Sequence, residues 1–87
     1  MHERALMNDV VREVEAVARH AGAVRVTRIS VRLGALSHFT PEHFREHWDD
    51  ASRTTLAEGA DVDAYLDEDT ASPRATGVVL ESVEVES

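Results

Sequence analysis

Hydrophobic residues recur at steps of three and four near the start of the chain, and polar residues fill the positions between them. The members of this stripe are Leu6, Met7, Val10, Val11, Val14, Val17, Ala18 and Ala21. Such spacing is typical of the buried face of an amphipathic α-helix. Gly22 follows where a left-handed residue often ends a helix, and Glu3 places a negative charge at the expected N-terminus. We therefore predict one helix over residues 4–21.

A second helix is expected within ALSHFTPEHFREHW, residues 35–48. Thr40 suits the N-cap, and Pro41 suits the first helical position, where its missing N–H costs no hydrogen bond. The aromatic side chains expected on its buried side are Phe39, Phe44 and Trp48. We predict that this helix runs to about Leu56 and stops at Gly59.

Three further segments favour β-strands. Residues 24–34 (VRVTRISVRLG) are rich in β-branched side chains, but their apolar phase shifts between Val26 and Ile29. This shift indicates a bulge or partial cover of both faces. Residues 62–66 (VDAYL) alternate apolar with polar positions, and residues 78–86 (VVLESVEVE) carry acidic residues on the side expected to be exposed.

The predicted order is αβαββ, which fits an α+β fold. We expect a two-layer sandwich in which a three-stranded mixed sheet has two helices on one face. The first two strands would cross over right-handedly if they are parallel, and the last two are expected to form a hairpin. Their connection, DEDTASPRATG at residues 67–77, is polar and too short for a further domain. Residues 1–87 therefore make one small domain.

Charge and composition exclude several classes of binding partner and of metal site. Nine basic residues against seventeen acidic ones give a net charge of −8, which repels phosphate backbones and anionic lipids. No stretch approaches the roughly 20 apolar residues of a membrane span, and no secretory signal pattern is present. We expect a cytoplasmic protein that binds neither nucleic acid nor membranes. The absence of Cys excludes thiolate zinc sites and a cysteine nucleophile, so a metal would need His, carboxylate or backbone nitrogen.

Catalytic patterns are missing from the sequence. The serines and threonines lack the context of a nucleophile elbow, and the four glycines form no phosphate-binding loop. The many acidic residues do not follow the spacing of a calcium-binding loop, which favours a solvated acidic surface. We therefore expect that the protein is not an enzyme.

The first three residues, Met1, His2 and Glu3, are the strongest candidate for a chemical site. The amine of Met1, the amide nitrogen of His2 and the imidazole Nδ1 of His2 can close fused chelate rings on one ion. A fourth donor would come from Glu3 or another histidine. Ni(II) and Cu(II) favour such square-planar nitrogen donors. The alternative is an exposed His and a capping Glu at a frayed terminus, and spacing alone does not decide between them.

The other histidines allow two interpretations. His43 and His47 are four residues apart on the predicted second helix, so they can clasp one ion from the same face. The run lacks the glutamate placement of a metalloprotease motif, and no third ligand follows from the sequence. The alternative is that both are solvated residues flanking the buried aromatic rings. His38, in the loop before the second helix, is expected to be exposed, and His20 is expected to interact with the C-terminus of the first helix.

Several segments together resemble the HypA/HybF family of hydrogenase nickel-incorporation proteins, which are nickel metallochaperones. They are MHE followed by LM, VRVTRISVRLGALS, PEHF, TLAEGADV and ESVEVE, in this order. The resemblance implies a Ni(II) site made by Met1, His2 and Glu3. It also implies delivery of nickel to the large subunit of a NiFe hydrogenase, or to urease, together with a partner GTPase.

The chain departs from this family pattern at residues 67–77. Family members usually carry a zinc-binding insertion with paired CxxC motifs between the last two strands, whereas this chain has the short polar connection there. No zinc is therefore expected. The alternative function is a metal-independent adaptor that keeps the fold and the surface facing the GTPase. The sequence leaves open the fourth nickel ligand, including His38, His43 and His47, and the choice among nickel, copper and cobalt.

Overall fold

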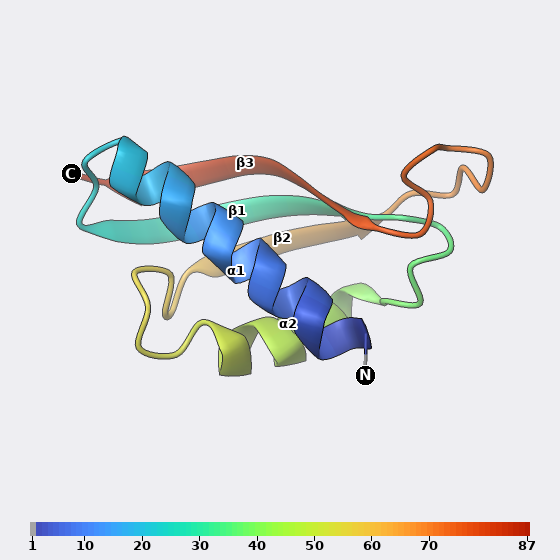
Figure 1. The fold of residues 1–87 in the computed structure, drawn as a ribbon, viewed down its shortest axis with the longest axis horizontal. Coiled ribbons are helices and arrows are strands. Elements are labelled where there is room, and N and C mark those ends of the chain that lie inside the picture. The colour runs from blue at the N-terminus through green and yellow to red at the C-terminus, as the bar shows by residue number, and fades with distance from the viewer. Residues whose placement is uncertain (1) are drawn as a thin grey trace.

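Two helices and a three-stranded sheet make up the fold (Figure 1). The computed structural model describes the backbone of residues 2–87 and the side chains of residues 4–87. The elements are α1 (His2–His20), β1 (Arg25–Leu33), α2 (Pro41–Ala51), β2 (Asp61–Leu66) and β3 (Val78–Glu86). The predicted αβαββ order and α+β class are confirmed. No helix in this described part of the chain is long and apolar enough to cross a membrane.

The strand β1 lies in the middle of the sheet, whose order is β2-β1-β3. It pairs in parallel with β2, where Ile29 is opposite Val62, and antiparallel with β3, where Ile29 is opposite Val83. The sheet is mixed, as predicted. The predicted hairpin between the last two strands is wrong, because β2 and β3 lie on opposite edges of β1.

The burial of β1 explains why it takes the central place. Its inward side chains, each at most 1% exposed, are Val26, Ile29, Val31 and Leu33. A β2–β3 hairpin would leave one edge of this strand without a partner. The connection over residues 67–77 instead passes around the end of β1. There the Asp67 N–H donates to the Leu33 carbonyl at 2.8 Å, and the Gly34 N–H donates to the Gly77 carbonyl at 2.9 Å.

Both helices cover one face of the sheet, with α1 crossing it diagonally and α2 packed beside β2 (Figure 1). The predicted stripe of α1 is buried at Met7, Val10, Val11, Val14 and Ala18. Val17, at the margin of that stripe, is 44% exposed. The aromatic side chains Phe39, Phe44 and Trp48 are buried as predicted, and the rings of the last two stack with centroids 6.4 Å apart.

Local signals in the sequence fix several boundaries. Gly22 follows α1 with φ +70°, the left-handed conformation predicted for it. The Thr40 hydroxyl accepts the His43 N–H at 3.1 Å, which confirms the N-cap of α2. The pairing of β1 with β3 shifts register between Val26 and Arg28, where the sequence indicated a bulge.

The helix α2 is shorter than predicted, because it ends at Ala51 and not near Leu56. Ser52 caps it with its backbone N–H on the carbonyls of Asp50 and Trp48, and Thr54 then takes a left-handed φ of +65°. Of the apolar residues that follow, Ala57 and Ala60 are buried and Leu56 is partly buried, all outside a helix. The Leu56 carbonyl accepts the Val26 N–H at 2.9 Å, so this turn is anchored to the start of β1.

The connection over residues 67–77 packs directly on Gly34. A Cβ atom at this glycine would lie 2.6 Å from the Arg74 carbonyl oxygen and closer still to the carbonyl of Ala75. Both neighbours are backbone atoms, which cannot swing aside as a side chain can. The Leu36 N–H donates to the same Ala75 carbonyl, so the two segments are bonded at the point of contact. Only glycine fits here.

We predict that Gly34→Ala lowers the free energy of unfolding by about 1–3 kcal/mol, the usual cost of forcing extra atoms into a packed site. Urea denaturation followed by far-UV circular dichroism measures this. Gly77→Ala is the matched control, since a Cβ there would lie 3.9 Å from its nearest neighbour, the Arg74 carbonyl oxygen. Equal midpoints for the two variants would contradict the close approach.

Candidate metal centre

The residues predicted to bind metal lie at the very start of α1. The helix begins at His2, whereas Met1 and the side chains of His2 and Glu3 lie outside what the structure describes. The backbone position still matters for the chemistry. The first four N–H groups of an α-helix have no acceptor within the helix, so amide nitrogens at this end are not committed to helical hydrogen bonds.

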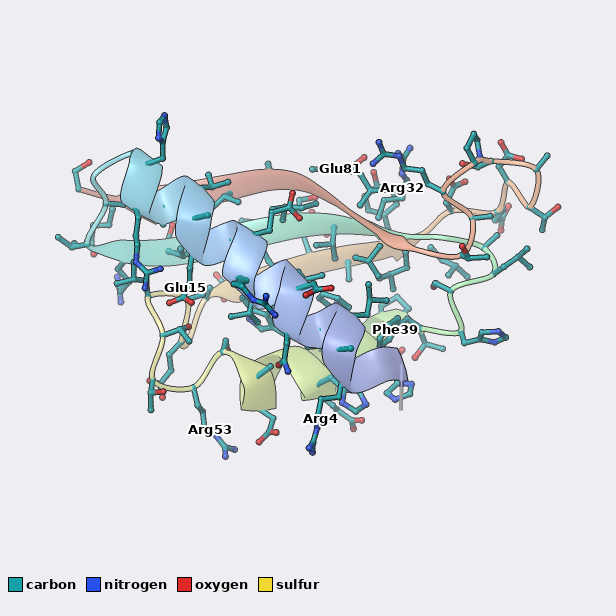
Figure 2. The ribbon with its side chains drawn as sticks, viewed as in Figure 1. Arg4, Glu15, Arg32, Phe39, Arg53 and Glu81 are labelled. Atoms are coloured by element: carbon teal, nitrogen blue, oxygen red, sulfur yellow. The ribbon has the colours of Figure 1, made fainter. Side chains whose placement is uncertain are left out.

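The start of α1 is drawn beside the first turns of α2, with which α1 is in contact (Figure 1). Met7 is 2% exposed and belongs to the same buried cluster as Phe44 and Trp48. Packing therefore holds α1 against α2 from its second turn onward. Arg4 and Phe39 mark this end of the molecule in Figure 2.

The two histidines of α2 are brought together by the helix. The Nε2 atoms of His43 and His47 are 2.8 Å apart, and their ring centroids are 4.6 Å apart. Phe39 lies edge-on to both rings, with centroid distances of 5.6 Å to His43 and 6.3 Å to His47. Both histidines are half-buried. They are therefore not the solvated flanking residues that one interpretation of the sequence expected.

His38 is exposed, as predicted, and His20 is also exposed. His38 has a left-handed φ of +68° in the loop before α2, and His20 lies in the last turn of α1. Among the residues with described side chains, no group of three or more His, Asp or Glu is placed to hold one ion. Within that part of the chain, the His43–His47 pair is thus a two-donor arrangement.

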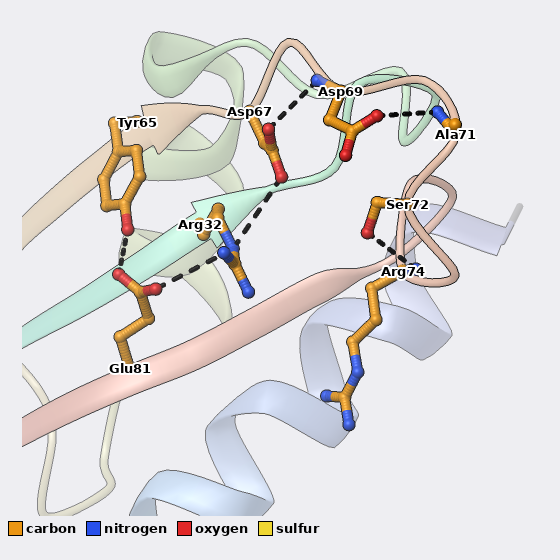
Figure 3. A network of polar contacts seen from close by, with 8 residues as sticks. All are labelled: Arg32, Tyr65, Asp67, Asp69, Ala71, Ser72, Arg74 and Glu81. Atoms are coloured by element: carbon orange, nitrogen blue, oxygen red, sulfur yellow. Dashed lines mark hydrogen bonds and ion pairs between the residues drawn. The ribbon is translucent and has the colours of Figure 1, made fainter.

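A second polar cluster lies on the open face of the sheet and joins all three strands (Figure 3). Arg32 alternates with buried Val31 and Leu33, so its side chain points away from the helices. Its Nε atom is 3.7 Å from Glu81 of β3 and 4.0 Å from Asp67 after β2. The Tyr65 hydroxyl of β2 donates to the Glu81 carboxylate.

These carboxylates already have partners, so the cluster links strands and offers no ready cation site. No sequence pattern indicated this cluster, because it depends on β1 lying between β2 and β3. With the hairpin that the pattern favoured, Arg32 would not stand between Tyr65 and Glu81. Strand alternation could have placed Arg32 and Tyr65 on one face once the strand order was known.

Comparison with known proteins defines the class to which this fold and helix start belong. The family of hydrogenase/urease nickel-incorporation metallochaperones, HypA, matches residues 1–81. The chain belongs to this family, which confirms the resemblance seen in the sequence.

Individual relatives carry the same name. A hydrogenase maturation factor HypA from Methylocella silvestris is 43% identical over 83 residues, which are 93% of this chain and 74% of the relative. One from Chlorobium limicola is 40% identical over 63 residues, 72% of this chain and 54% of the relative. One from Acidithiobacillus ferrooxidans is 35% identical over 63 residues, 72% of this chain and 56% of the relative. The matched segment therefore spans little more than half of the last two relatives.

The hydrogen bond from Tyr65 to Glu81 predicts a shifted titration. Donation to the carboxylate stabilises the neutral phenol, and the negative charge of Glu81 opposes the phenolate, so the pKa of Tyr65 is raised above 10.0. Because the chain has one tyrosine, the absorbance of its phenolate reports this group alone. We predict that Glu81→Gln moves the titration to lower pH, while Glu84→Gln leaves it in place. An unchanged midpoint in Glu81→Gln would refute the contact.

Proposed function

We propose that the chain binds Ni(II) through the amine of Met1, the amide nitrogen and imidazole Nδ1 of His2, and Glu3. The observation that carries the proposal is that the match to a nickel-incorporation family begins at residue 1, so these three residues lie inside the matched segment. Residues 1–87 then act as a single nickel-binding domain.

Electrostatics at the helix start favours this donor set. A bare divalent cation is disfavoured at a helix N-terminus, where the macrodipole is positive. Deprotonated amide nitrogens and the Glu3 carboxylate offset the charge of the ion. The amide N–H groups of the first turn serve no hydrogen bond inside α1, so their deprotonation leaves the helix intact from Met7 onward. Fused chelate rings also bring the donors together at low entropic cost.

The biological role that we propose is delivery. The chain hands nickel to a NiFe hydrogenase or to urease with the help of a partner GTPase, without catalysis of its own and in the cytoplasm. The family's description as a hydrogenase/urease nickel-incorporation metallochaperone supports this role. No zinc site is proposed, because the chain has no Cys to supply thiolates.

One prediction tests the donors of the proposed nickel site. In a titration of the untagged protein with nickel sulfate, His2→Ala should weaken binding by more than the roughly 10–100-fold that losing an outer-shell partner costs. Acetylation of the Met1 amine should do the same, since it removes a donor. His20→Ala is the control, because this exposed histidine lies in the last turn of α1. Undiminished affinity in both the His2 variant and the acetylated protein would overturn the site.

If nickel affinity were undiminished in both proteins and binding to a GTPase were retained, a metal-independent adaptor would describe the protein better. A pull-down in the presence of EDTA separates the two functions, because chelation removes the ion and leaves the protein surface unchanged.

Another prediction concerns the pH dependence of nickel affinity. The amine, the imidazole and the amide must all be deprotonated to bind the ion, so nickel affinity should rise as pH increases from about 6 to 8. Binding should release protons, and calorimetry in buffers of different ionisation enthalpy counts them. An affinity that is constant over this range would exclude amine and amide donors.

A further inference from the structure

We propose that His43 and His47 bind one divalent transition-metal ion through their Nε2 atoms, at a site separate from Met1, His2 and Glu3. The proposal rests only on the described residues of α2 and the loop before it. It stands independently of the N-terminal site, and it adds a second position for a metal ion beside the start of α1.

The distance between the two nitrogens carries the argument. Metal–imidazole bonds are about 2.0–2.1 Å long, so two such nitrogens at a right angle on one ion lie about 2.9 Å apart. The observed separation of 2.8 Å matches these neighbouring positions, whereas a tetrahedral ion would require about 3.3 Å. The geometry thus favours ions with right-angled coordination, such as Ni(II) and Cu(II), over Zn(II).

The same contact shows what binding requires of the protons. With no ion present, 2.8 Å between two ring nitrogens fits an N–H of one imidazole donating to the other. An ion between them needs a lone pair from each Nε2. The donating ring must therefore move its proton to Nδ1, while both imidazoles stay neutral.

The surroundings hold the two rings in place before any ion arrives. Residues four apart lie on one face of a helix, and the Thr40 cap fixes the first turn through the His43 N–H. Phe39, 3% exposed, packs its ring against both imidazoles. A site whose side chains are already ordered loses little conformational entropy when the ion binds.

Charge also favours a cation here. The helix α2 carries acidic residues at Glu42, Glu46, Asp49 and Asp50 against a single basic residue, Arg45. The Arg45 Nε donates to the Val62 carbonyl of β2 at 3.4 Å, which directs this positive group toward the sheet edge. His43 lies in the first turn of α2, where the macrodipole is positive, and these carboxylates offset that charge, in keeping with the net charge of −8.

The test uses full-length protein in which His2→Ala and acetylation of Met1 remove the N-terminal donors. Titration with nickel sulfate or copper sulfate should show one equivalent of bound ion, weaker than in the parent because fewer donors take part. His43→Gln/His47→Gln should abolish this equivalent, and His47→Gln alone should also abolish it. The matched control, His20→Gln/His38→Gln, removes two exposed histidines and should leave it unchanged.

A second measurement needs no substitution at His43 or His47. In the ¹⁵N-labelled protein with blocked N-terminal donors, a small amount of Cu(II), which is paramagnetic, should broaden the ring signals of both His43 and His47. The proposal fails if this protein binds no ion, if the double variant binds as well as the control, or if only one ring responds. These outcomes differ from the one that would overturn the N-terminal site. That site fails if nickel affinity is undiminished after His2→Ala and after acetylation of Met1.

Discussion

The burial of β1 is the constraint around which the other elements are arranged. Four of its side chains are removed from water almost completely, and burying each apolar side chain of this size contributes about 1.5–3 kcal/mol. A parallel neighbour requires the chain to cross over between the strands, which places α2 between β1 and β2 in the sequence. An antiparallel neighbour on the other edge requires the chain to pass the end of β1, where Gly34 admits the backbone of Arg74 and Ala75.

The sequence predicted those features that depend on neighbours in the chain. Thr40 caps α2 through a residue three positions away, and Gly22 ends α1 by its own conformational freedom. The hairpin prediction was wrong because strand pairing depends on burial summed over the whole sheet, and a local sequence pattern does not determine this sum. The predicted end of α2 was wrong for a related reason. The run after Ala51 contains no proline and no glycine before Gly59 to mark an earlier end, but the hydrogen bond from the Val26 N–H to the Leu56 carbonyl anchors this segment as a turn.

The two candidate metal sites differ in the same way, since one depends on neighbours in the chain and the other depends on the fold. Chelation by Met1, His2 and Glu3 requires only atoms adjacent in the chain, so the sequence could suggest it without knowledge of the fold. The pairing of His43 with His47 follows from helical spacing, yet their distance and their half-buried state do not. Phe39, which packs edge-on to both imidazoles from the preceding loop, is a contact that spacing does not reveal. Spacing alone therefore left two interpretations open, a metal-binding pair and two solvated flanking residues.

The short connection over residues 67–77 bears on how the domain holds together without a thiolate zinc lobe at this position. Its turns are closed by side chains within the segment, where Asp67 accepts the Asp69 N–H, Asp69 accepts the Ala71 N–H and Ser72 accepts the Arg74 N–H (Figure 3). Its two ends bond to the end of β1, at Leu33 and Gly34. A structural metal contributes folding energy where a segment lacks such bonds of its own. Here β3 reaches the edge of β1 through backbone hydrogen bonds and close packing, so residues 67–77 connect the two edges of the sheet without thiolate ligands.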